Sequence, residues 1–441
     1  MSTDKRELSR SLKARHIMMM ALGGAIGAGM FKGSSTSIGM AGPGVLLDYM
    51  IGGIILLFVM KGLAEMAVQN PGAKTFRDLL EPLLGRFAGY FSGWMYFLNW
   101  VLVMAAETAA AALFLQYWFH DVPLWVLSLL VSVVITLVNL LHVNVYGETE
   151  FWLAGLKIAV LILFILLGGT ILFTGYEHHP AVGFQHLTEN GGFFPHGIQG
   201  LASAMLVVMF SFGGSEMIGM TLGETENPEK VLPRVARGVI MRILVFYVLP
   251  ILIIVSLVPW NGLSGTESPF VTVFKAVGIP YAADIMNFVM LTAVLSATNT
   301  GMYAASRMLY SQALSGQAPK FLAFLSERRV PTRALLVSIS FLYVGVIIAF
   351  FTKGKTFDYL MVIPGYTVLI IWILLAFAHV RSRMTHTGQG FPLGSFVAFL
   401  ALIVIFIGVA VTSPLYGTLI SVAAMLFVGV SYLFSRKRTS L

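Results

Sequence analysis

Two glycine-rich stretches interrupt apolar segments of this chain: GGAIGAG at residues 23–29 and FSFGGSE at residues 210–216. Each lies within a run of about twenty apolar residues, the length that crosses a membrane as a helix. Glycine inside a helix costs roughly 1 kcal/mol relative to alanine, so each cluster predicts a broken helix. Close helix packing is the competing interpretation, because Gly23 and Gly27 form a GxxxG pattern.

The composition around these stretches is that of a membrane protein. Of the 441 residues, 57% are hydrophobic and 11% are charged, and the mean hydropathy is +0.85. Soluble domains carry about a quarter charged residues, so this composition cannot form a water-exposed surface. The chain has no cysteine, which excludes disulfides and thiolate chemistry. The apolar runs predict an all-α polytopic membrane protein with about twelve transmembrane helices, at residues 17–39, 43–67, 88–117, 123–142, 150–175, 197–221, 235–258, 280–310, 332–352, 357–379, 391–412 and 415–435.

The positive charges predict the orientation of these spans. Of the 28 Lys and Arg residues, 23 lie in the two tails or at one set of span ends, and three lie at the other set. This asymmetry favours cytoplasmic tails at residues 1–16 and 436–441. We therefore assign the net charge of +8 to orientation and not to a nucleic-acid partner. The short tails favour a multi-pass protein of a bacterial cytoplasmic membrane.

The polar loops predict neither a metal nor a nucleotide site. The outer stretch 176–197 carries four histidines, which we interpret as solvated because carboxylate support is missing: His178, His179, His186 and His196. The sequence GKT at 354–356 resembles the end of a phosphate-binding loop, but position 349 is alanine where that loop needs glycine. An ion gradient is therefore the expected energy source.

The positions of the two breaks indicate a secondary transporter. They fall in the first and sixth spans, which correspond in two five-span halves, and such pairs mark substrate sites. In the predicted orientation, the half-helix that begins near Gly27 turns free N–H groups toward the membrane centre, which favours an anion. The half-helix that ends near 210–212 turns free carbonyls toward the same centre, which favours a cation. Both together suit a zwitterion, so the sequence predicts an amino-acid substrate.

Several motifs follow one another from about residue 15 to 335, namely RHIMMMALGGAIGAGMFKGSS, AGPG, YGETEFWLAGLKI, GGFFPHG, FSFGGSEMIG, GETENPEK, LTAVLSATNTGMYAASRML and APKFL. They resemble those of the amino acid transporter family, within the amino acid–polyamine–organocation superfamily of permeases. The resemblance implies a LeuT-type core at 17–380, made of inverted repeats at about 17–175 and 197–380. Two further helices follow at 391–435. It also implies proton-coupled uptake with no other cofactor.

The resemblance also assigns a substrate site to the two breaks. The carboxylate is expected at Ile26, Gly27, Ala28 and Gly29, next to Ala25. Many relatives have Thr or Ser where this chain has Ala28, which puts one hydroxyl contact in doubt. The ammonium is expected at the carbonyls of Phe210, Ser211 and Phe212, next to Gly213 and Gly214. Phe212 is also expected to form part of the pocket wall and gate.

Ionisable residues inside spans are costly, so they are functional candidates. Lys157 either extends toward the cytoplasmic interface or, as in relatives with the LKI motif, takes the place of a coupling sodium ion. A desolvated lysine can release and regain a proton, so we predict proton coupling there. Glu216 is either a dipole partner at its helix start or a second proton-responsive group. Glu107 either lines the substrate pocket or satisfies a neighbouring helix.

The side chain of the substrate is left open. The selectivity pocket is expected to draw on Ala110, Ser296 and Asn299. Proton symport with alternating access is the predicted activity. The alternatives are an amino-acid exchanger, a permease for GABA or a small amine, and an amino-acid sensor that transports nothing. The sequence predicts no oligomeric state, and membrane lipid is the other expected partner.

Two charges depart from the family pattern. Lys32 follows the first break, and Asp48 lies early in the second span, at nearly the same predicted depth. Either charge alone would be costly in lipid. We therefore predict an ion pair between Lys32 and Asp48 beside the outer vestibule. The alternative is that both face water in an open cavity.

Overall fold

The structure is a computed structural model that describes residues 13–439 except 142–145, 177–179, 264–266, 280, 328, 353 and 386–389. The predicted tails at 1–16 and 436–441 lie partly outside this range, as do His178 and His179. The described chain is a bundle of helices, and the predicted all-α polytopic fold is confirmed. Within the described residues, nine helical stretches are long and apolar enough to cross a membrane by length and composition.

Each of the twelve predicted spans coincides with a helix or with an interrupted helix. The unbroken spans are α4 (Val45–Gln69), α6 (Arg86–Gln116), α7 (Leu124–Leu141), α8 (Tyr146–Thr174), α10 (Pro228–Leu257), α12 (Ala282–Leu314), α13 (Thr332–Thr352), α16 (Leu393–Thr412) and α17 (Leu415–Thr439). Short helices lie between spans, namely α5 (Phe76–Leu84) and α11 (Pro269–Val277). The division into two inverted repeats stays a prediction.

The first and sixth spans are interrupted at the glycine clusters, as predicted. The first span consists of α1 (Ala14–Ala25), α2 (Ala28–Phe31) and α3 (Gly33–Ala41). The sixth consists of α9 (Gly197–Phe212) and the 3₁₀ helix η3 (Ser215–Met220). The tenth span consists of α14 (Thr356–Leu360) and α15 (Val362–Thr385), and helical hydrogen bonds continue through Met361 between them.

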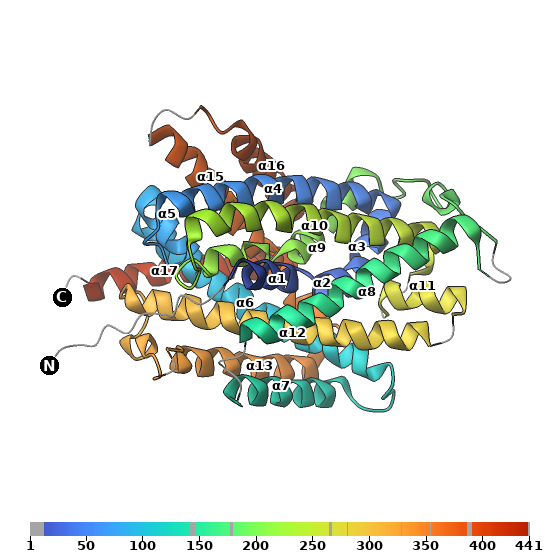
Figure 1. Ribbon diagram of the computed structural model, residues 1–441, viewed down its shortest axis with the longest axis horizontal. Helices are drawn as coiled ribbons and strands as arrows, with labels where there is room; N and C mark the ends of the chain where they lie inside the picture. Colours follow the sequence, from blue (N-terminus) through green and yellow to red (C-terminus); the bar gives the residue numbers. More distant parts are fainter. Residues whose placement is uncertain are drawn as a thin grey trace.

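The interrupted spans lie in the middle of the bundle. In Figure 1, α1 and α2 run between α4 and α10 above and α12 and α13 below. Packing contacts agree, because α1 touches α8, α10, α12 and η3, while α9 touches α4 and α15. The glycine-rich breaks are thus enclosed by protein, where unwound backbone can be tolerated in a membrane.

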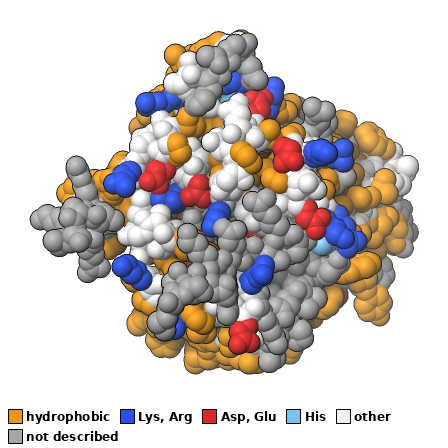
Figure 2. Space-filling model, turned by 60° about the vertical axis from the view of Figure 1, so that its left-hand side comes forward, with side chains coloured by type: hydrophobic (Ala, Val, Ile, Leu, Met, Phe, Trp, Pro, Cys, Tyr) orange, Lys and Arg blue, Asp and Glu red, His pale blue; other side chains and the backbone are white. Residues whose placement is uncertain are grey.

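The surface separates into apolar flanks and a polar end. Exposed large hydrophobic side chains cover the outer helices, for example Leu166, Ile347, Val404 and Phe427. Figure 2 shows Lys, Arg, Asp and Glu gathered on the end that carries α5, with hydrophobic side chains around the rim. Lipid contact with the flanks and water contact with the ends account for this pattern. The α5 end is the one whose loops the sequence predicts to be cytoplasmic.

Candidate functional site

The break in the first span turns a backbone N–H toward a carboxylate. α1 ends at Ala25, Ile26 and Gly27 leave the helix, and α2 begins at Ala28. The Ala28 N–H donates to both oxygens of Glu107, at 3.0 Å to Oε1 and 2.9 Å to Oε2. Glu107 comes from α6 and is buried. A carboxylate therefore sits at the start of this half-helix in the structure, the kind of group that the sequence analysis expects there.

The two breaks touch one another through glycine. A Cβ on Gly214 would lie 2.6 Å from the carbonyl oxygen of Gly24, and Gly214 also has a φ of +97°. A Cβ on Gly29 would lie 2.7 Å from Cα of Ser211. Because backbone cannot yield as a flexible side chain can, both positions require glycine. Close packing, the competing interpretation of the clusters, is thus part of how the breaks are built.

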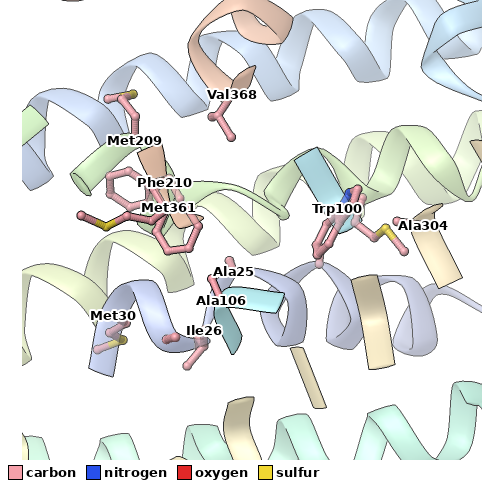
Figure 3. Close-up of a cluster of buried hydrophobic side chains, with 14 of the residues drawn as sticks. Ala25, Ile26, Met30, Trp100, Ala106, Met209, Phe210, Ala304, Met361 and Val368 are labelled. Atoms are coloured by element: carbon pink, nitrogen blue, oxygen red, sulfur yellow. The ribbon is translucent and has the colours of Figure 1, made fainter. Parts of the chain in front are cut away.

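A small cavity lies at this junction. Figure 3 shows Phe210 from α9, Trp100 from α6 and Val368 from α15 around the break at Ala25 and Ile26. The cavity volume is about 10 Å³, room for about one water molecule. An amino acid would need these side chains to move apart. The cavity is lined by Gly24, Ala25, Gly29, Asn99, Trp100, Val103, Glu107, Phe210, Ser211, Gly213, Gly214 and Val368.

The carbonyls expected to hold an ammonium already have protein partners. Phe210 O accepts from the Gly213 N–H at 3.0 Å, and Phe212 O accepts from the Ser215 hydroxyl at 2.7 Å. The Tyr247 hydroxyl lies 2.6 Å from Ser211 O and 2.5 Å from Ala25 O. A hydroxyl has one proton, so it can satisfy only one of these two carbonyls at a time. Ala25 O also accepts from the Gly27 N–H at 3.1 Å, so Ser211 O is the carbonyl left for a ligand's N–H group when the hydroxyl turns to Ala25.

Tyr247 was missed by the sequence analysis. It comes from α10, far along the chain from both breaks, and its ring packs 4.8 Å from that of Phe212 and 5.7 Å from that of Tyr49. Nothing in its local sequence marks it, because a tyrosine in an apolar span usually serves packing. Only the fold brings its hydroxyl between the two broken helices.

Lys157 points at the first break. Its ammonium donates to Gly23 O at 2.8 Å, and only 1% of the residue is exposed. The alternative that its side chain reaches the cytoplasmic interface is therefore wrong for this structure. The residue that it binds, Gly23, directly precedes Gly24, which lines the cavity. A protonated lysine thus contributes directly to holding α1 at the point where it breaks.

A second buried carboxylate, missed by the sequence analysis, lies near Lys157. Glu150 is fully buried in α8, and its two oxygens accept from the Ser296 hydroxyl at 2.7 and 2.8 Å. Its charge interacts with that of Lys157. Glu150 precedes Lys157 by seven residues, two helical turns, so both share one face of α8. That spacing was the available signal.

The remaining predicted residues divide into two groups. Glu216 accepts from the Gly214 N–H at 3.1 Å and from the Trp372 indole at 3.3 Å, so its contacts are those of a cap on the second break. The other group is buried near the breaks but does not line the cavity: Ile26, Gly27, Ala28, Phe212, Ala110, Ser296 and Asn299. Their roles in binding stay predictions, as do those of the lining residues.

Asn99 and Trp100 are cavity residues that the sequence analysis did not select. Oδ1 of Asn99 is buried and has no hydrogen-bond partner within the described part of the chain, whereas the buried Trp100 indole interacts with the Tyr96 hydroxyl. A buried polar atom without a partner is costly, so a ligand group is a reasonable partner for Asn99 Oδ1. Both residues lie on α6, whose predicted contribution was Glu107 and Ala110.

The structure does not form the predicted ion pair between Lys32 and Asp48. Oδ2 of Asp48 is buried and has no hydrogen-bond partner among the described residues, while the charge of Lys32 interacts with Asp358 on α14. The helix ends explain the error. Lys32 lies nine residues before the end of α3, whereas Asp48 lies three residues after the start of α4. Their depths thus differ by six residues, or roughly 9 Å.

Comparison with known proteins shows the family of this chain. The family model described as amino acid permease matches residues 16–437. The uncharacterized amino acid permease YvbW of Bacillus subtilis is 52% identical over 99% of this chain and 100% of its own length. The gamma-aminobutyric acid permease of Bacillus subtilis is 37% identical, over 99% of this chain and 96% of its own length.

A third relative comes from another bacterium. The aromatic amino acid transport protein AroP of Escherichia coli O157:H7 is 38% identical over 98% of this chain and 96% of its own length. The family model and these relatives cover nearly the whole chain, and the relatives are permeases. The chain therefore belongs to the amino acid permease family of the amino acid–polyamine–organocation superfamily.

Proposed function

We propose that this membrane protein imports an amino acid by proton symport, alternating between outward-open and inward-open states. Both chain ends lie in the cytoplasm in this proposal. The observation that carries it is the hydrogen bond from the Lys157 ammonium to Gly23 O at 2.8 Å. A neutral amine has a weaker hold on that carbonyl than an ammonium has. Loss of the lysine proton therefore loosens α1 at the break that forms the substrate site.

The substrate is a zwitterion in this proposal. Its carboxylate takes the N–H groups at the start of α2, one of which Glu107 occupies in this structure. Its ammonium takes the carbonyl that Tyr247 leaves unsatisfied. Amino-acid amides, which lack the carboxylate, are expected to compete poorly with amino acids.

The names of the relatives give two candidate classes for the side chain of the substrate. One relative is named for gamma-aminobutyric acid and another for aromatic amino acids. The side-chain end of the cavity offers Asn99, Trp100, Val103 and Val368. A thermal-shift screen of the purified protein against the common amino acids identifies the ligand, because a ligand that binds the native state raises its melting temperature.

Reconstituted vesicles test the transport proposal with that ligand. Uptake driven by an imposed inward proton gradient is the expected result. Uptake only in exchange for internal amino acid would replace symport with exchange. Binding without flux would instead indicate a sensor.

A further inference from the structure

Glu150 is a buried carboxylate to which the proposed substrate site assigns no role. It lies outside the substrate cavity, and no part of the residue is exposed. Ser296 donates to both of its oxygens, at 2.7 and 2.8 Å, and the Thr300 hydroxyl interacts with it as well. Both hydroxyls belong to α12. A buried carboxylate inside a membrane protein is expensive, and proton relay is one of the roles that such groups serve.

Glu150 and Lys157 border the same residue of the first span. The Lys157 ammonium donates to Gly23 O, and a Cβ on Gly23 would collide with Oε1 of Glu150. Seven residues separate Glu150 from Lys157 along α8, about 10 Å along the helix axis. Side chains on a helix tilt toward its N-terminus, so the long lysine side chain reaches back toward Glu150. One bridging water or a rotamer change of the lysine closes the remaining gap.

The groups that surround Glu150 are neutral apart from Lys157, among the described residues. α1 presents Gly23, α12 presents the hydroxyls of Ser296 and Thr300, and α8 itself presents Lys157. Among the described residues, Lys157 is the group whose charge acts on Glu150. The charge of Glu107 on α6 also acts on Lys157.

The position of Glu150 along α8 fits a path to the cytoplasm. α8 begins at Tyr146, the end that the proposed orientation places in the cytoplasm. Glu150 lies four residues from that start, about 6 Å, whereas Lys157 lies eleven residues away, about 16 Å. Both side chains are buried in this structure, so release of a proton to cytoplasmic water needs the inward-open state. Glu150 is then the nearer of the two to the cytoplasmic start of α8.

We propose that Glu150 accepts the proton that Lys157 releases and passes it to cytoplasmic water. The inference rests on the proposed proton symport. In the transfer an N–H bond of the ammonium breaks and an O–H bond forms on the carboxylate, which leaves a neutral amine and a neutral acid. The acid then gives its proton to water, which restores the carboxylate. Lys157 regains a proton from the outer side in the next cycle.

The test is Glu150→Gln in reconstituted vesicles, because glutamine keeps the shape of the side chain but cannot carry a proton. Two rates are measured: net uptake driven by a proton gradient, and counterflow of labelled for unlabelled amino acid. Counterflow returns the loaded carrier and needs no proton release. We expect net uptake to fall by about a hundredfold while counterflow persists. Glu150→Asp is expected to restore part of the net uptake.

The matched control is Glu229→Gln, the same change at an exposed position in the first turn of α10. It is expected to leave both rates unchanged. If wild-type protein shows no gradient-driven uptake, the proposed symport is overturned and the relay with it. If wild-type uptake is proton-driven and Glu150→Gln retains it, the relay alone is overturned.

If Glu150 has only a structural role, the two measured rates respond differently. Equal loss of net uptake and counterflow in a folded Glu150→Gln protein would overturn the relay, since a simple counter-ion to Lys157 explains it. If that variant does not fold, Ser296→Ala carries the test, because it removes a hydroxyl that donates to the carboxylate. Net uptake is expected to fall more than counterflow, and equal loss in this variant overturns the relay.

Discussion

At the scale of single residues, the breaks are held by side chains from spans that are distant in the sequence. Glu107 holds the start of α2, Lys157 holds the end of α1, and Tyr247 lies between the two broken spans. Each of these hydrogen bonds can be altered: the one to Glu107 by substrate binding, the one from Lys157 by loss of its proton, and the one from Tyr247 by rotation of its hydroxyl. The site is therefore built from contacts that a ligand or a proton can redistribute.

Gly29→Ala tests the contact between the breaks. A methyl group there would lie 2.7 Å from Cα of Ser211, so α2 and α9 must separate. We expect binding of every amino acid to weaken by about tenfold or more, because a misplacement of about 1 Å at a site costs that much. Thermal shift with several amino acids measures it.

The control for that variant is Gly39→Ala in the same span. A Cβ on Gly39 meets no atom within 4 Å. It is expected to bind as the wild type does. A change of side-chain preference in Gly29→Ala, with overall affinity retained, would show that this glycine does not position the part common to all amino acids.

Tyr247→Phe tests the hydroxyl between the broken spans. Its removal leaves Ser211 O without this donor at a cost of about 1–3 kcal/mol, while Ala25 O keeps the Gly27 N–H at 3.1 Å. We expect a lower melting temperature that substrate partly restores, since its ammonium supplies an N–H group to Ser211 O. Tyr343→Phe, which removes a 3.0 Å contact with Thr136 away from the site, is the control. Equal effects of ligand on both variants would argue against the proposed ammonium site.

At the scale of helices, sequence predicted the spans well because each carries its own signal. Twenty apolar residues and the positions of glycine are local properties, and the breaks in the first and sixth spans follow from them. The tenth span has no glycine cluster between α14 and α15, and its helical hydrogen bonds continue through Met361. The same local rule therefore accounts for a span without such a break.

The error in the Lys32–Asp48 pair comes from the helix ends. The prediction placed helix ends from hydropathy, and a shift of two residues in each helix was enough to separate the two depths. The structure instead sets Lys32 against Asp358, with Thr36 of α3 lying 3.5 Å from Oδ1 of Asp358. This link joins the outer half of the first span to the tenth.

A double-mutant cycle tests which carboxylate is coupled to Lys32. Lys32→Leu and Asp358→Leu should each lower the melting temperature, because each removes one of two interacting charges of which Lys32 is buried and Asp358 partly buried. The double variant Lys32→Leu/Asp358→Leu should lower the melting temperature by less than the sum of the two single-variant decreases. The combination of Lys32→Leu with Asp48→Leu should be additive. The reverse pattern would reinstate the original pair.

At the scale of the whole molecule, the sequence predicted the fold class and most cavity-lining backbone, but not the side-chain network around it. Gly24, Asn99, Trp100, Val103 and Val368 line the cavity without having been selected. Glu150 and Ser296 meet across 146 residues of chain. Such contacts depend on how α8, α10 and α12 pack around the broken spans, which one sequence does not specify.

The central claim is that the protonation of Lys157 couples the proton to the amino acid. The most direct measurement follows the pH inside reconstituted vesicles after the identified amino acid is added outside. Wild-type protein is predicted to acidify the interior as the amino acid enters. Lys157→Ala is predicted to abolish this acidification while still binding or exchanging the amino acid. Undiminished acidification in Lys157→Ala would contradict the account.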